Sequence, residues 1–162
     1  MDTVNQEMRS RIMSSVAQND TGPELALRRA LHKNGIRYRL HDRRLPGSPD
    51  IVLPKHHAVV FVHGCFWHRH DCKYTTTPSS NRQFWEAKFA ANVARDKNQY
   101  EKLFNAGWRI ATVWQCSLKE KAGASIIASG IQEWLGGSAL FAHFPVSAGD
   151  VEVADAVKPV QV

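Results

Sequence analysis

The length, composition and charge of this chain limit what it can be. Its 162 residues suit a single domain, and a hydrophobic content of 43% argues against wholesale disorder. No run approaches the ~20 apolar residues of a membrane helix, and the polar N-terminus lacks a signal-peptide pattern. We therefore expect a cytoplasmic protein with no membrane association.

The charge is basic and unevenly distributed. Of the 21 basic and 15 acidic residues, 19 and 11 lie within residues 1–120. A positive surface favours polyanions because it neutralises phosphates and releases counterions, although many basic proteins bind no nucleic acid. Nucleic acid is the first partner to test.

The first predicted element with clear end signals is a helix over residues 22–34. Thr21 is suited to cap it, Glu24 occupies the capping-box position, and Gly35 stops it. Its apolar face contains Leu27 and Leu31. We expect three basic side chains to face solvent: Arg28, Arg29 and Lys33.

The remaining elements follow from apolar periodicity. We predict strands over residues 36–40, 51–53, 58–62 and 108–114, and helices over 84–106 and 125–135. The strands over 51–53 and 58–62 form a hairpin. Three tryptophans are assigned to the core: Trp108, Trp114 and Trp134. Residues 1–137 form the domain, and residues 138–162 are interpreted as a loosely attached or disordered tail.

The three cysteines indicate a metal site. Their odd number and the missing secretion signal argue against a disulfide framework. With one histidine they form a Cys₃His set typical of structural Zn²⁺, and we choose Cys65, His70, Cys72 and Cys116 as its ligands. The spacing leaves open whether His68 replaces His70, and buried free cysteines are the alternative to a metal site.

A carboxylate at the hairpin forms a second candidate site. Asp50 precedes the strand over 51–53, and the antiparallel partner strand ends near Val62 and His63. A carboxylate oxygen of Asp50 and a main-chain carbonyl of that edge are suited to share Mg²⁺. Taken alone, a Pro-Asp pair before a strand is more often only a turn.

Several motifs together resemble one known family. They are Leu45-Pro46-Gly47-Ser48-Pro49-Asp50, the block His63-Gly64-Cys65-Phe66-Trp67-His68-Arg69-His70-Asp71-Cys72, Phe84-Trp85, and Asn92-Val93-Ala94-Arg95-Asp96. In this order they resemble the very short patch repair DNA mismatch endonucleases, over roughly residues 8–135. The resemblance implies a restriction-endonuclease-like α/β fold of the PD-(D/E)xK type, with a central mixed sheet flanked by helices. It also implies nicking of one DNA strand 5′ to the thymine of a T:G mismatch.

The resemblance also implies roles for single residues. Asp50 resembles the Mg²⁺ ligand, with the carbonyl of Val62 as the second ligand where family members can carry threonine. His68 resembles the general base, and Asp96 resembles the carboxylate that orients it. Glu24 and His63 resemble residues that position metal-bound water and the scissile phosphate. From the residues alone, Glu24 is explained as a capping residue and Asp96 as a solvated helix residue.

Aromatic side chains suggest how a mismatch is recognised. Phe66 and Trp67 lie within the cysteine-rich loop, and Trp85 begins the long helix. Aromatic wedges unstack base steps at lower cost beside a mismatch, although such residues are more often core. The resemblance implies that these three residues intercalate and that Met13, on the N-terminal helix, approaches from the opposite groove.

We therefore expect a monomeric, zinc-stabilised, Mg²⁺-dependent endonuclease that acts on double-stranded DNA with a T:G mismatch. Mismatch-repair proteins and a companion cytosine methyltransferase are partners implied only by the resemblance. Two alternatives remain: a zinc-stapled DNA-binding module without catalysis, and a nuclease of the same fold with another mismatch or sequence preference.

Overall fold

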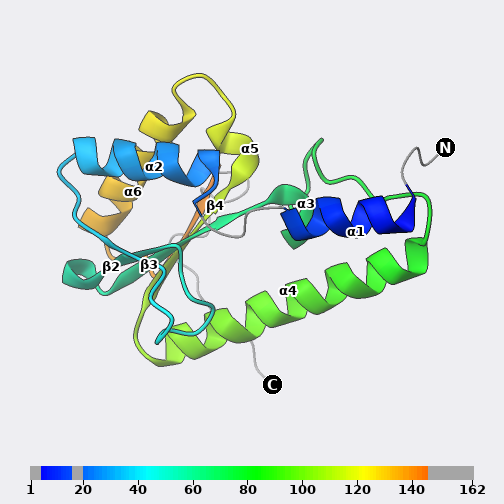
Figure 1. The fold of residues 1–162 in the computed structure, drawn as a ribbon. Coiled ribbons are helices and arrows are strands. Elements are labelled where there is room, and N and C mark those ends of the chain that lie inside the picture. The colour runs from blue at the N-terminus through cyan, green and yellow to red at the C-terminus, as the bar shows by residue number, and fades with distance from the viewer. Residues whose placement is uncertain (1–4, 16–19, 146–162) are drawn as a thin grey trace.

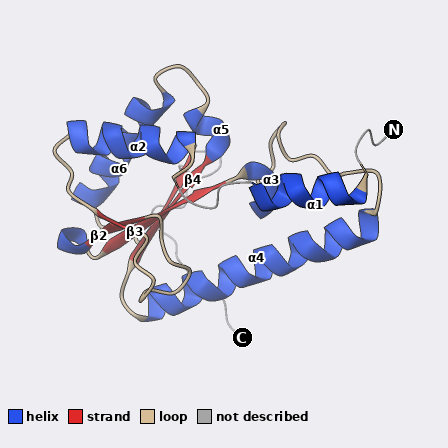
Figure 2. Cartoon of the chain, in the orientation of Figure 1, coloured by secondary structure: helices blue, strands red, loops and turns tan. Residues whose placement is uncertain are grey.

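The computed structural model describes residues 5–15 and 20–145, and a five-stranded mixed sheet forms its centre (Figure 2). The strands are β1 (Arg39–Leu40), β2 (Ile51–Leu53), β3 (Ala58–His63), β4 (Arg109–Trp114) and β5 (Phe141–Phe144). The helices are α1 (Gln6–Ser15), α2 (Gly22–Lys33), α3 (Cys65–His68), α4 (Arg82–Asn105), α5 (Gln115–Leu118) and α6 (Gly123–Gly136), with a 3₁₀ turn at Pro54–His56.

The strands occur in the sheet in their sequence order, β1-β2-β3-β4-β5. The β1/β2 and β2/β3 pairs are antiparallel, whereas β3/β4 and β4/β5 are parallel. The parallel pairs need crossover connections, which α3 with α4 and α5 with α6 supply. This α/β architecture agrees with the predicted mixed sheet flanked by helices.

Helices cover both faces of the sheet (Figure 1). Helices α2 and α6 pack on one face, where Leu27, Leu31 and Ile131 meet Val60 in the larger core cluster. Helix α4 crosses the other face, where Leu103 packs in a second cluster, and extends well beyond the sheet (Figure 1). Within the described residues, none of the helices combines the length and apolar character needed to cross a bilayer.

Most of the predicted elements are confirmed. Helix α2 has Thr21 at its N-cap, and the Glu24 carboxylate accepts a hydrogen bond from the Thr21 N–H at 3.3 Å. The β2–β3 hairpin, β4, α4 and α6 lie close to their predicted positions. Gly107, with φ +83°, follows the end of α4 in the left-handed conformation that glycine adopts without steric cost.

The strand predicted over 36–40 is wrong for its first three residues. Only Arg39 and Leu40 pair with β2, opposite Val52 and Ile51. Ile36 donates its N–H to the Leu31 carbonyl at 3.0 Å and packs its side chain into the larger core cluster. The apolar spacing at the start of this segment therefore reflects the packing of Ile36 against the core residues of α2, and not pairing within the sheet.

The predicted tail begins too early. Residues 141–144 form β5, parallel to β4, and the ring of Phe144 is buried. A Cβ at Gly130 of α6 would lie 2.7 Å from the Phe144 ring, so only glycine allows this close packing. The part of the predicted tail over 146–162 lies outside the described residues.

Two predicted core tryptophans are only half-buried. Trp134 is buried, whereas Trp108 stacks on His57 with ring centroids 4.1 Å apart. Trp114, the last residue of β4, stacks on His70 at 4.5 Å. Trp108 immediately precedes β4 and Trp114 is its last residue, so the two rings lie at opposite ends of the strand.

Candidate active site and metal cluster

A histidine–carboxylate pair connects α3 to α4. His68 ends α3, and its Nδ1 forms a hydrogen bond with Oδ2 of Asp96 on α4. The side-chain amide of Asn92 donates to the Trp67 carbonyl at 3.3 Å and holds the two helices in register. Because Asp96 accepts the proton on Nδ1, the neutral ring has a free lone pair on Nε2. This arrangement is suited to general-base chemistry at Nε2.

His63 lies directly behind this pair. It is the last residue of β3, and its ring stacks on that of His68 with centroids 3.8 Å apart and planes 6° apart. Burial, together with the nearby His68 ring, lowers the pKa of His63 to about 3. The His63 ring is therefore uncharged at neutral pH, and its face packs against the face of the His68 ring.

Asp50 lies at the start of β2 and contacts the end of β3. Its Oδ2 accepts the Val62 N–H at 2.7 Å. Burial and the neighbouring Glu24 carboxylate together raise the pKa of Asp50 to about 6. A largely desolvated carboxylate that is destabilised in this way favours a bound cation, which would supply the missing positive charge.

The groups around Asp50 fit a hard cation. In an extended strand the N–H and C=O of one residue face the same edge, so the Val62 carbonyl shares the edge on which its N–H meets Asp50. Carboxylate and carbonyl oxygens are the ligands that Mg²⁺ prefers. The donor set therefore suits a divalent cation.

Glu24 joins the helix cap to this site. Its Oε1 accepts a hydrogen bond from Arg28 Nη2 at 2.7 Å, and its Oε2 accepts the Thr21 N–H. The carboxylate is almost fully buried and close enough to Asp50 to raise the pKa of that residue. Glu24 can therefore serve in the cap of α2 and lie beside Asp50 at the same time.

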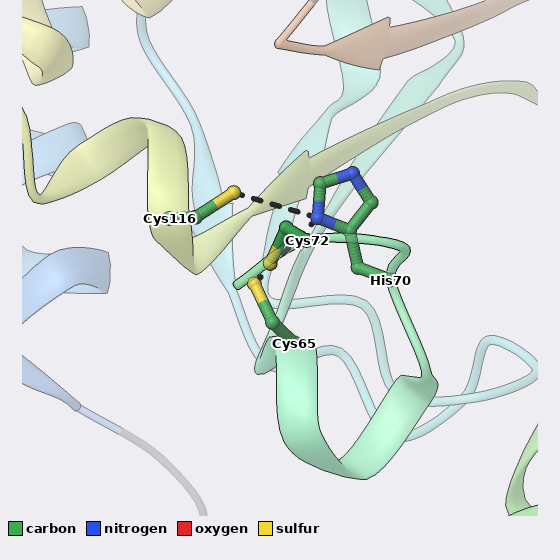
Figure 3. A group of neighbouring side chains, drawn as sticks. All are labelled: Cys65, His70, Cys72 and Cys116. Carbon is green, nitrogen blue, oxygen red and sulfur yellow. Dashed lines mark hydrogen bonds between the residues drawn. The ribbon is translucent and has the colours of Figure 1, made fainter. Parts of the chain in front are cut away.

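Three cysteines and one histidine converge beside α3 and α5 (Figure 3). One potential ligand atom from each lies within 4.8 Å of all the others. Nδ1 of His70 lies 3.4 Å from the Cys116 sulfur and 3.8 Å from the Cys65 sulfur. The structure thus brings His70 to the thiols, whereas His68 points to Asp96.

The electrostatics of this cluster also suit a cation. Burial raises the pKa of Cys65 to about 12, so its thiolate is strongly disfavoured unless positive charge is added. Burial lowers the pKa of His70, which keeps the imidazole neutral as a metal ligand requires. Soft sulfur donors with one imidazole match the preferences of Zn²⁺.

The aromatic residues form one cluster between α3 and α4. Phe66 contacts Trp67, Trp85 and Phe89 edge to face, with ring centroids 5.0 to 5.8 Å apart. Trp85 is only 3% exposed, whereas Phe66, Trp67 and Met13 of α1 are half-buried. Direct contact between Trp85 and DNA therefore requires a change in this packing. The exposed ring of the cluster is that of Phe84, which the sequence analysis did not select as a contact.

Sequence reasoning missed a second set of residues near Asp50. Arg28 was expected to face solvent, but it is buried and bonded to Glu24, Asp20 and His41. The i, i+4 spacing of Glu24 and Arg28 was the one signal that could have indicated the pair. Nothing local in the sequence indicates that His41 lies beside them.

A cavity of about 400 Å³ lies next to the histidine–carboxylate pair. His63, His68 and Asp96 line one part of it, and Tyr100 and Trp114 supply aromatic walls. The Tyr100 hydroxyl is hydrogen-bonded to Thr112 at 2.7 Å. The imidazole of His68 is thus accessible from a largely apolar hollow between α4 and the sheet.

Comparisons with known proteins identify the family to which this mixed α/β chain belongs. The family model described as DNA mismatch endonuclease Vsr matches residues 1–74. The type II nicking enzyme V.XorIIP of Xanthomonas oryzae pv. oryzae is 46% identical over 119 residues, 74% of this chain and 88% of that protein. The DNA mismatch endonuclease Vsr of Escherichia coli is 36% identical over 138 residues, 84% of this chain and 88% of that protein.

A third relative is the type II nicking enzyme V.NmeAIP of Neisseria meningitidis, 41% identical over 121 residues, 75% of this chain and 86% of that protein. The chain belongs to the very short patch repair (Vsr) family of DNA mismatch endonucleases. It is therefore a DNA endonuclease, and the alternative of a DNA-binding module without catalysis is wrong.

Proposed function

We propose that the protein nicks one strand of duplex DNA 5′ to the thymine of a T:G mismatch, by Mg²⁺-dependent hydrolysis of the phosphodiester. One observation carries this proposal: a continuous line of contacts joins the two halves of the site. Asp50 accepts the Val62 N–H, His63 follows Val62, and the His63 ring stacks on His68, which is bonded to Asp96. The proposed general base, His68, and the proposed cation-binding carboxylate, Asp50, are thus adjacent.

His68 acts as the general base in this proposal. Nε2 accepts a proton from the attacking water, and Asp96 stabilises the imidazolium that forms while holding the ring in place. Stacking on neutral His63 restricts rotation of the His68 ring without adding a competing charge. The product is a nick with a 5′-phosphate.

Asp50 and the Val62 carbonyl hold Mg²⁺, which when bound supplies positive charge for the scissile phosphate and the leaving oxygen. Glu24 and His63 position water and phosphate near these ligands. Glu24 is supported in this role by its closeness to Asp50. Hydrogen bonds from the Thr21 N–H and from the Arg28 guanidinium fix its carboxylate.

Zn²⁺ bound by Cys65, His70, Cys72 and Cys116 has a structural role. The four residues join the loop after β3 to the start of α5, so an ion there fixes α3 and with it His68. The sheet order, with an antiparallel hairpin carrying Asp50 next to parallel strands, supports assignment to the restriction-endonuclease-like fold of the PD-(D/E)xK type.

DNA contacts come from the aromatic cluster and α1. Phe66 and Trp67 are partly exposed at one end of the cluster, and Trp85 joins them when the packing opens beside a weakly stacked mismatch. Met13 approaches from the opposite groove. The enzyme acts as a monomer, its domain extends at least to Phe144, and mismatch-repair proteins are its partners.

A second candidate specificity follows from the comparisons. Relatives named type II nicking enzymes match this chain with higher identity than the protein named mismatch endonuclease. The same nuclease site is compatible with another sequence context or another mispair. The catalytic residues are identical in both proposals.

One gel experiment tests these proposals. We expect nicking of a T:G duplex with Mg²⁺, slower nicking of other mismatched duplexes, and none of a matched duplex or without a divalent cation. Equal cleavage of matched and mismatched duplexes would contradict mismatch specificity.

Two variants test the assigned roles in the same assay. We expect His68→Ala to lower the single-turnover nicking rate about 10²- to 10⁴-fold, because a general base contributes that much. His32→Ala, on the exposed side of α2, is the matched control and keeps the full rate. Cleavage by His68→Ala at the wild-type rate would refute the role of His68 as base.

A further inference from the structure

A polar cluster behind Asp50 combines the exposed Asp20, the buried Glu24 and the partly buried His41. Asp20, Glu24 and His41 each offer a ligand atom, and these atoms lie within 4.8 Å of one another. The guanidinium of Arg28 fills the space between them. Its Nη1 lies 2.7 Å from Asp20, and its Nη2 lies 2.7 Å from both Glu24 and His41 Nε2. The cluster therefore already holds its cation, which is Arg28.

Arg28 determines which nitrogen of His41 carries the proton. A guanidinium can only donate hydrogen bonds, so Nε2 of His41 must accept from Nη2 at 2.7 Å. The neutral ring then has its proton on Nδ1. The backbone fixes the ring in place, because the His41 N–H donates to the Asp50 carbonyl at 3.4 Å.

The resulting Nδ1–H donor faces Asp50 without a partner. Of the buried side-chain nitrogen and oxygen atoms in the described residues, two lack a hydrogen-bond partner, and both belong to this cluster: Arg28 Nε and His41 Nδ1. Nδ1 lies 4.0 Å from Asp50 Oδ1, too far for a direct hydrogen bond. The other oxygen, Oδ2, is already bonded to the Val62 N–H. The free donor and the free carboxylate oxygen thus face the same space.

We infer that His41 donates from Nδ1 to an oxygen atom bound beside Asp50, and that Arg28 is a positioning residue that fixes this tautomer. An N–H group cannot ligate a cation, so its partner is an oxygen in the coordination sphere of the cation, from either water or the DNA phosphate. The inference rests on the proposed function of Asp50 as a Mg²⁺ ligand. It adds a hydrogen-bond donor to the atoms that bind the cation, and this donor, His41, lies outside the family motifs.

Two nearly isosteric variants separate this role from a structural one. His41→Asn keeps a donor amide near the position of Nδ1, whereas His41→Leu has similar branching without polar atoms. His41 has φ +45°, and asparagine is the non-glycine residue best suited to that conformation. Circular dichroism and thermal unfolding confirm that both variants are folded before they are compared.

We expect His41→Leu to slow single-turnover nicking at limiting Mg²⁺ about tenfold or more, and His41→Asn to stay within about threefold of wild type. Titration with Mg²⁺ alone, followed by calorimetry, identifies the source of the oxygen. Weaker Mg²⁺ binding by His41→Leu without DNA indicates bound water, and an effect seen only with DNA indicates the phosphate. Equal rates in the two variants, whether normal or impaired, would overturn the inference.

An NMR measurement tests the tautomer without any activity assay. In ¹⁵N-labelled protein we expect the His41 ring, assigned by its loss in His41→Asn, to carry its proton on Nδ1. In Arg28→Met the proton moves to Nε2, which then faces Glu24 Oε1 at 3.4 Å. A wild-type ring protonated on Nε2 would overturn the inference. Wild-type protein that nicks no duplex would instead refute the proposed function.

Discussion

The proposed metal ligand Asp50 lowers the stability of the metal-free protein at neutral pH. Its carboxyl is largely desolvated and lies beside Glu24, and its pKa is raised from 3.8 to about 6. A carboxyl with a raised pKa binds its proton more tightly in the folded state than in the unfolded state. Its contribution to the free energy of unfolding therefore falls as the pH rises from about 4 to 6 and stays low above that range.

Asp50→Asn should therefore stabilise the protein while abolishing nicking. We expect the metal-free variant to gain about 3 kcal/mol in the free energy of unfolding at pH 7, and almost nothing at pH 3.5, where Asp50 is largely protonated in both states. Urea unfolding at the two pH values measures this difference.

Asp42→Asn is the control for that experiment. Hydrogen bonds from Arg44 lower the pKa of the half-buried Asp42 to about 2, so loss of its charge brings no gain in stability at pH 7. An Asp50→Asn variant that is less stable than wild type at pH 7 would contradict the assigned environment of Asp50.

The residue types predicted which chemical groups form the candidate sites better than they predicted which residues contact one another. The block from His63 to Cys72 indicated a metal site and a base, but the spacing alone left His68 and His70 interchangeable. Their directions differ because Arg69 adopts φ +59° and ends α3 between them. That local turn sends one imidazole toward α4 and the other toward the thiols.

At the scale of elements, the cysteine cluster connects parts of the chain that are distant in sequence. Cys116 is the second residue of α5, which follows β4, whereas the other three members follow β3. We expect Cys116→Ala to lose bound Zn²⁺ and about 3 kcal/mol or more of stability, because loss of a structural metal is among the most damaging changes. Metal analysis and thermal unfolding measure both effects.

Ser117→Ala is the matched control, since Ser117 is the next residue of α5 and its hydroxyl donates to the Trp114 carbonyl at 2.7 Å. Alanine keeps the Ser117 backbone group that contacts the Cys116 thiol. This variant should keep its metal and nearly all of its stability. If chelation left the melting temperature of the wild-type protein unchanged, the cluster would have no structural role.

The fifth strand provides a test of where the domain ends. A chain ending after Gly137 loses β5 and the buried Phe144 ring, whereas a chain ending after Pro145 keeps both. We expect the shorter chain to lose at least ~3 kcal/mol, the usual cost of removing a buried phenylalanine. Denaturant unfolding of the two truncations compares them directly, and equal stabilities would contradict the role of β5.

The long helix α4 links the proposed recognition and cleavage regions. Trp85 near its start belongs to the aromatic cluster, Asp96 in its middle bonds His68, and Leu103 near its end is packed under the sheet. At 1.5 Å per residue its 24 residues span about 36 Å. We therefore expect displacement of the aromatic end by DNA to be transmitted along this helix to Asp96, the partner of the proposed base.

At the scale of the whole molecule, the net charge of +6 predicts salt-dependent DNA binding. If at least four phosphates are neutralised, the logarithm of the binding constant should fall with the logarithm of salt concentration with a slope of about −4. Fluorescence anisotropy with a T:G duplex in Ca²⁺, which we expect to support binding without cleavage, measures it. A slope near zero would contradict an electrostatic interface.

The sequence by itself determined the order of the elements, the capped helix α2, the β2–β3 hairpin and the residue types of both candidate sites. These features depend on neighbours within a few positions, such as Thr21 with Glu24 or the strands on either side of one turn.

Only the tertiary structure decided the contacts between distant segments. The burial of Arg28 against His41, the joining of Cys116 to His70, and the docking of β5 beside β4 each bring together residues 13 or more positions apart. Such contacts are set by how the helices pack on the two faces of the sheet, and local periodicity carries no information about that packing.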